Sequence, residues 1–146
     1  MINIIDRHII NKCRRIFPFA ARTSLFIIYF WFGLLKVLGT SPANPLVDSL
    51  LKSTMPFLTF QSFIFFFGIL EMVIGICFLI PNFNRIAGLL FLGHMATTFM
   101  PLVMLPVLTW QSPFVPTLEG QYIIKNVALM ATAVGLASIM KPLEKK

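Results

Sequence analysis

Four long apolar segments dominate the hydropathy pattern of the chain. They cover residues 22–39, 57–80, 86–108 and 121–140. A helix rises about 1.5 Å per residue, so each segment is close to the length needed to cross a hydrocarbon core about 30 Å thick. None of them alternates apolar and polar residues as the strands of an outer-membrane barrel do. The pattern therefore predicts four membrane-spanning helices in one membrane domain, residues 21–141.

The first 20 residues have a different pattern, that of an amphipathic helix. The residues that share its apolar face are Ile2, Ile5, Ile9, Cys13 and Ile16. The charged residues of this segment point largely away from that face, as in basic helices that lie on a membrane surface. We expect residues 1–20 to form an interfacial helix on the cytoplasmic leaflet, with Pro18 turning the chain towards the membrane.

A short helix is also expected between the first two spans. Apolar positions at Leu46, Val47, Leu50 and Leu51 follow Pro42, and the charged residues of the loop lie between them. We expect this helix to cap the outer surface of the bundle. The predicted fold is thus all-α, a four-transmembrane-helix bundle with an N-terminal amphipathic interfacial helix and a short outer-loop helix.

Composition and charge agree with a membrane protein. Hydrophobic residues make up 58% of the 146 residues and charged residues only 12%, with a mean hydropathy of +0.87, which excludes an ordinary soluble domain. The net charge of +7 follows the positive-inside rule and does not indicate nucleic-acid binding. Nine of the twelve basic residues fall on one side if both termini are cytoplasmic: Arg7, Lys12, Arg14, Arg15, Arg22, Arg85, Lys141, Lys145 and Lys146.

One acid, Glu71, lies near the middle of the second apolar segment. An acid at the centre of a spanning helix is unfavourable by about 2.5–3.5 kcal/mol, so Glu71 should face protein or trapped water and have a partner. It shares one helical stripe with Gln61, Ile64, Gly68 and Gly75. We expect this stripe to face the bundle, where Glu71 either fixes helix packing through a hydrogen bond or takes part in binding or proton handling.

His94, in the third segment, is the expected partner of Glu71. Glu71 lies nine residues before Ile80, and His94 lies nine residues after Arg85. A short turn joins the two segments, so both side chains should lie about 14 Å from the inner boundary. A hydrogen bond between them is then available, and histidine titrates near neutrality. Glu71 and His94 are the candidate catalytic residues, and the alternative for His94 is a donor that only supports packing.

Two lysines are expected at the outer level of the bundle. Lys36 shares a face with Tyr29 and Gly33, and its alternative is to extend towards the headgroups. Lys125 belongs to a small and polar face of the fourth segment, which should point inward. Two ammonium groups at one level require carboxylates or an anionic or carbonyl-bearing ligand. The candidate ligand-binding residues are Tyr29, Lys36, Gln61, Glu71, His94, Glu119, Lys125 and Asn126.

Four motifs in the chain resemble those of the DoxX-like family of small four-helix membrane proteins. They are GLLK at 33–36, GILEMVIGI at 68–76, GHMATTFMPLVMLP at 93–106 and LEGQYIIKNVAL at 118–129. The resemblance covers roughly residues 22–140 and leaves the N-terminal segment out. It implies a bundle in the bacterial inner membrane, with kinship to the small subunit of a thiosulfate:quinone oxidoreductase and to membrane components of thiol and oxidative-stress complexes.

Three functions are open from the sequence, and the resemblance favours the first. In that one the chain is a subunit of a membrane redox complex that binds a quinone or a small anionic or sulfur compound within the bundle, with soluble or membrane oxidoreductase subunits as partners. Whether it is itself an enzyme stays open, because it carries no flavin or haem motif and no metal-ligand cluster. The other two are a binder or transporter of an amphiphile or anion without redox chemistry, and a structural membrane anchor. The lipid bilayer is an expected partner and nucleic acid is not.

Overall fold

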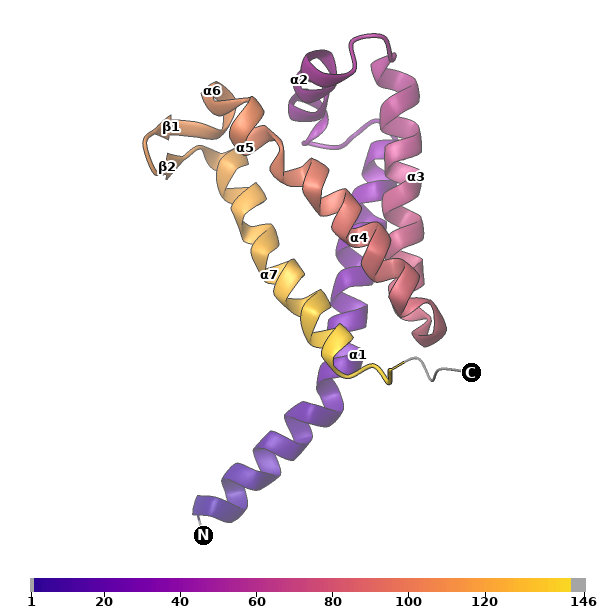
Figure 1. Ribbon diagram of the computed structural model, residues 1–146, viewed down its shortest axis with the longest axis vertical. Helices are drawn as coiled ribbons and strands as arrows, with labels where there is room; N and C mark the ends of the chain where they lie inside the picture. The colour runs from indigo at the N-terminus through magenta and orange to yellow at the C-terminus, as the bar shows by residue number, and fades with distance from the viewer. Residues whose placement is uncertain (1, 143–146) are drawn as a thin grey trace.

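Long helices make up most of the molecule in the computed structural model, which describes residues 2–142. The long helices are α1 (Ile2–Val37), α3 (Phe60–Leu79), α4 (Asn84–Phe99) and α7 (Leu118–Ser138). The shorter elements are α2 (Asn44–Thr54), the 3₁₀ helix η1 (Pro81–Phe83), α5 (Pro101–Met104), α6 (Pro106–Thr109) and a hairpin of β1 (Trp110–Ser112) and β2 (Val115–Pro116). Figure 1 shows α2, α5, α6 and the hairpin at one end of the molecule and the start of α1 and the end of α7 towards the other.

Three helical segments are long and apolar enough to cross a membrane. They are Asn3–Val37, Phe60–Leu79 and Pro81–Met104, and they support a helical membrane protein. The 21-residue helix α7 lies where the fourth span was predicted. It is not one of these three segments within the described part of the chain. The short helix predicted between the first two spans is confirmed as α2. The small hairpin was not predicted, because its strands contain only three and two residues.

α1 is one continuous helix, so the prediction of a separate helix that ends near Pro18 is wrong. Its 36 residues include Pro18 and extend over about 54 Å. A proline inside a helix removes only one backbone hydrogen bond, here to the carbonyl of Arg14, and commonly bends the helix. Figure 1 shows the first part of α1 projecting beyond the other helices and inclined to the rest. Residues 3–17 are all exposed there.

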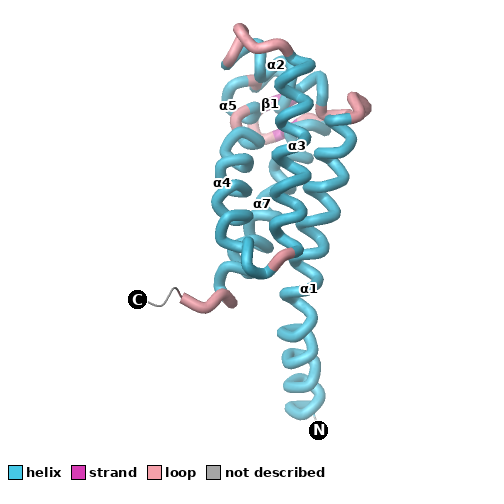
Figure 2. The backbone as a smooth tube through the Cα atoms, turned by 90° about the vertical axis from the view of Figure 1, so that its right-hand side faces the viewer, coloured by secondary structure: helices cyan, strands magenta, loops and turns pink. Residues whose placement is uncertain are grey.

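Glycines bring the backbones of α1 and α3 into contact. A Cβ atom on Gly33 would lie 2.5 Å from the carbonyl oxygen of Gly68, and one on Gly75 would lie 3.0 Å from the backbone nitrogen of Phe30. Small residues at such positions allow helices to approach closely in membranes. Figure 2 shows the two helices side by side along much of the bundle. This approach brings the polar side chains of α1 within reach of Glu71 on α3.

An apolar core closes the bundle on the side of η1. Leu25, Ile74, Phe78, Ala87 and Phe91 are at most 2% exposed and belong to one cluster from α1, α3 and α4. Leu136 brings α7 into the same cluster. Well-packed side chains of this kind hold helices in one arrangement. The core therefore fixes the relative positions of the helices that carry the polar residues.

Candidate functional site

A buried chain of hydrogen bonds joins α1, α3 and α4. Lys36 Nζ donates to Glu71 Oε2 at 2.6 Å, and His94 Nε2 lies 2.9 Å from Glu71 Oε1. Tyr29 Oη lies 3.2 Å from His94 Nδ1. The four side chains, called the polar network below, belong to residues that are only 4–7% exposed. The predicted bond between Glu71 and His94 is confirmed, and the alternative in which Lys36 extends towards the headgroups is wrong.

With Glu71 ionised and His94 neutral, the bonding pattern assigns the hydrogen positions of the polar network. An ionised carboxylate only accepts hydrogen bonds, so Nε2 of His94 carries the hydrogen that Glu71 accepts. Nδ1 is then free to accept from the hydroxyl of Tyr29. With a neutral imidazole, the ammonium of Lys36 and the carboxylate of Glu71 balance each other. Such pairing reduces the unfavourable free energy of burying either charge alone.

Aromatic rings enclose the imidazole. The ring of Phe67 stacks on His94 with centroids 4.9 Å apart and planes at 23°, and Tyr29 meets it edge-on at 5.2 Å. Lys36 Nζ lies 5.8 Å from the centroid of Phe67. These rings keep water away, which strengthens the electrostatic interactions within the polar network. The four side chains are therefore held away from solvent.

Two residues that lie next to the polar network were not predicted from the sequence. Phe67 precedes Glu71 by four positions on α3, and Thr98 follows His94 by four positions on α4. Thr98 Oγ1 donates to the backbone carbonyl of His94 at 3.0 Å and lies 3.3 Å from its Nδ1. Residues four positions apart on a helix are neighbours, so this spacing was the available signal.

Four predicted site residues lie outside the polar network. Gln61, Glu119 and Lys125 are exposed, and Asn126 is half-buried. Gln61 lies beyond the end of α1, because α1 ends at Val37 and a Cβ atom on Gly68 would already meet Val37. The other stripe residues of α3 are buried as predicted, from Ile64 to Gly75.

The prediction that Lys125 points inward beside Lys36 is wrong. Its ammonium lies 5.1 Å from the ring centroid of Tyr122 on the exposed surface of α7. The rotation of α7 is determined by close contacts at its first turn, where a Cβ atom on Gly120 would meet the backbone carbonyl of Thr109. Ile123 is buried as a result, and Gln121 and Lys125 are exposed at this end of α7.

Replacement of Lys125 by glutamine should change the free energy of unfolding by less than about 0.5 kcal/mol. The side chain is exposed, and its ion–ring contact with Tyr122 is weak at such a position. Detergent-solubilised protein titrated with SDS would measure the change. Lys36→Gln is the matched comparison and should be much more destabilising, since it leaves Glu71 buried without its cation. Similar losses of stability in Lys125→Gln and Lys36→Gln would contradict the placement of Lys36 as buried and Lys125 as exposed.

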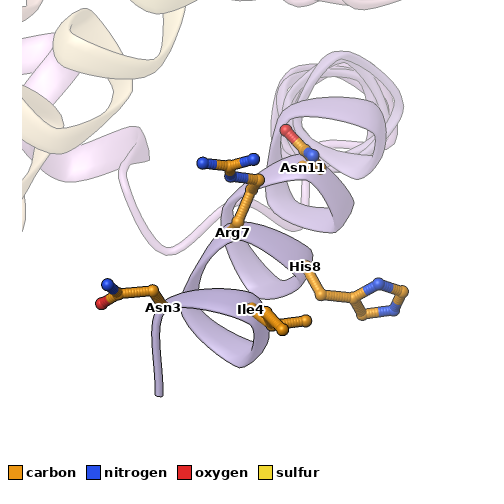
Figure 3. Close-up of a pocket in the computed structure, with 5 residues that line it drawn as sticks. All are labelled: Asn3, Ile4, Arg7, His8 and Asn11. Atoms are coloured by element: carbon orange, nitrogen blue, oxygen red, sulfur yellow. The ribbon is translucent and has the colours of Figure 1, made fainter. Parts of the chain in front are cut away.

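A concavity on the free part of α1 is separate from the polar network. Figure 3 shows the residues that line it, Asn3, Ile4, Arg7, His8 and Asn11, on successive turns of one helix. Their side chains point away from one another, and no other helix forms an opposite wall. Within residues 2–142, no group of three His, Cys, Asp or Glu side chains is close enough to hold a metal ion. Cys13 and Cys77 are both free thiols.

Comparison of the chain with models of protein families, with curated proteins and with solved structures found no match. The class of molecule is therefore defined by the fold and the site together. It is a helical membrane protein in which a lysine, a glutamate, a histidine and a tyrosine from three helices form one buried polar network.

Proposed function

We propose that the protein is a subunit of a membrane redox complex and that its polar network holds and exchanges a proton. The observation that carries the proposal is Glu71, which bonds Lys36 and His94 at the same time inside apolar helices. Ionisable groups at such depth are unfavourable and typically mark proton relays or binding sites. The motifs that resemble the DoxX-like family support the same proposal, because Lys36, Glu71 and His94 each lie in one of them.

The proton positions follow from the bonds of His94. In the neutral imidazole, Nδ1 accepts from Tyr29 and Nε2 donates to Glu71. A proton added at Nδ1 makes an imidazolium, whose charge the adjacent Glu71 carboxylate stabilises. The hydroxyl oxygen of Tyr29 or Thr98 then accepts the new N–H, at 3.2 or 3.3 Å. The polar network can thus hold an additional proton with the new N–H bonded, while the hydroxyl hydrogen of Tyr29 loses Nδ1 as its acceptor.

A quinone does not fit into the polar network in this arrangement. Lys36 and His94 are the donors that would bind its carbonyl oxygens, and both donate to Glu71. Their low exposure leaves no open path for a ring. In our proposal, a quinone or a small anionic or sulfur compound binds elsewhere in the complex, and the polar network provides only the site for the proton.

The topology of the proposal has four spans, with α7 as the fourth and both termini on the cytoplasmic side of the inner membrane. α7 would extend over about 32 Å, enough for a bilayer core. Figure 1 supports the orientation, because the first half of α1 and the start of α4, which carry Arg7, Lys12, Arg14, Arg15 and Arg85, lie at the same end of the molecule. Arg85 also donates to the carbonyl of Lys141 there, at 2.6 Å.

Glu71→Gln and His94→Gln should each lower redox turnover by about 10²-fold or more, the usual contribution of a positioned proton donor or acceptor. The measurement is reduction of decylubiquinone with thiosulfate in membranes that contain the whole complex. Lys125→Gln is the control and should keep its turnover. A folded Glu71→Gln protein with full turnover, or wild-type membranes with none, would contradict the proposal.

A structural anchor is the second candidate, and the complete pairing of the polar network favours it. Each charged or polar group there bonds a neighbour on another helix, as in a contact that only fixes packing. This function predicts that Glu71→Gln lowers stability without changing turnover. The carrier hypothesis needed Lys36 and Lys125 at one entry site, and we do not propose it because one lysine is buried and the other exposed.

A further inference from the structure

The first half of α1 forms an uncovered amphipathic helix, which we call the α1 arm and define as residues 3–16. All its residues are exposed, although several are large and apolar. Ile5, Ile9 and Ile16 are 55%, 56% and 50% exposed and lie on one face of the helix. A stripe of isoleucine in water is unfavourable, so a surface that covers it would stabilise the α1 arm.

The charge of the α1 arm indicates what covers the stripe. It carries four basic residues, Arg7, Lys12, Arg14 and Arg15, against one acid, Asp6. Lys12 lies next to the isoleucine stripe. The arginine side chains are long enough to extend beyond the edge of the apolar face. A second copy of the chain would bring the same positive charges together and is disfavoured. Charge complementarity requires an anionic partner.

The position of the α1 arm selects an anionic membrane surface among such partners. The arm continues without interruption into residues 22–37, the apolar part of α1 that the sequence predicts to span the membrane, so its C-terminal end lies where that span begins. Basic amphipathic helices bind headgroups of anionic lipids with their apolar face in the interface. Arg85 and Lys141 lie at the same end of the bundle and extend the positive surface.

We propose that the α1 arm lies on the membrane and binds anionic lipid headgroups, with Pro18 as the point of bending. The helix lacks one hydrogen bond at Pro18, so its axis can change direction there while residues on both sides stay helical. Bending turns the isoleucine stripe into the interface and leaves the basic residues at headgroup level. The bundle itself does not have to rearrange, because residues 3–16 are exposed along their whole length.

The exposed Cys13 provides a position for the test. Cys77→Ala removes the second thiol, so that a polarity-sensitive fluorophore can be attached to Cys13 alone. The labelled protein is reconstituted in vesicles of phosphatidylcholine alone or mixed with phosphatidylglycerol, and quenching by spin-labelled lipid is measured. We expect quenching to be about threefold stronger in the anionic vesicles and to fall at 1 M salt, where the screening length is about 3 Å.

Two variants identify the cause of the quenching. Arg14→Gln with Arg15→Gln should reduce it towards the level in phosphatidylcholine, whereas Lys125→Gln, on α7, should leave it unchanged. Pro18→Ala restores the missing hydrogen bond and should weaken quenching without changing the charge. A water-exposed label in both vesicle types would overturn the proposal. Equal quenching in both, unaffected by salt, would overturn the requirement for anionic lipid.

Discussion

Replacement of Glu71 by alanine is expected to destabilise the folded protein by about 3–5 kcal/mol. Lys36 is 6% exposed, and Glu71 is its ion-pair partner at 2.6 Å. The substitution leaves a buried ammonium group without a counter-charge and removes the acceptor of His94 Nε2–H. SDS titration of the solubilised protein, followed by circular dichroism, measures the free energy of unfolding.

An exposed ion pair is the matched control for this prediction. Lys52 and Asp48 are also 2.6 Å apart, but their side chains are 73% and 30% exposed. Such a pair on a helix stabilises by only about 0.3–0.5 kcal/mol, so Asp48→Ala should have little effect. Replacing Lys36 and Glu71 together by methionine removes both charges and should recover much of the loss. Equal losses for Glu71→Ala and Asp48→Ala would show that burial of the ion pair does not matter.

Replacement of Gly68 by alanine is expected to separate α1 from α3. The new Cβ atom would lie 2.7 Å from the carbonyl oxygen of Gly33 and 3.0 Å from Cβ of Lys36. A backbone oxygen cannot move aside as a flexible side chain does, so the helices themselves must shift. Overpacking alone destabilises by about 1–3 kcal/mol. We expect a larger loss, because the same shift pulls Lys36 away from Glu71.

Gly93→Ala is the control for the glycine contact. Gly93 lies on α4, and no atom lies within 4 Å of the position that its Cβ would take. Alanine is the better helix former, so the free energy of unfolding should stay the same or rise slightly. The same SDS titration compares the two variants. If Gly68→Ala were tolerated as well as Gly93→Ala, the close approach of α1 and α3 would be refuted.

The sequence predicted the central part of the polar network because that part depends on local rules. The spacing of Gly68, Glu71 and Gly75 places them on one helical face, and that face is buried. Equal distances from a short turn placed Glu71 and His94 at one level, and their side chains meet at 2.9 Å. An acid in an apolar helix needs a partner, so burial of Glu71 against another helix was foreseeable.

The tertiary structure alone determined which lysine joins Glu71. The helical period of α7 shows that Gln121, Lys125 and Ala128 share a face, but it does not show which way that face points. Contacts distant in sequence decide it, with Gly120 against Thr109 and Gly135 against the ring of Phe17. The Gly120 contact lies on the side of α7 opposite Lys125, so it turns Lys125 outward and leaves Lys36 as the cation of the polar network.

The same distinction applies to the ends of the helices. Local sequence signals placed Pro18 near the edge of the membrane. Whether the helix stops or bends at Pro18 depends on the packing contacts of the residues on either side. In α1 the following residues pack against α3 through Gly33, which keeps them helical. The sequence by itself determined the apolar segments and the residues on each helical face, because periodicity and length are local properties. Which faces meet was decided only by packing between segments distant in the chain.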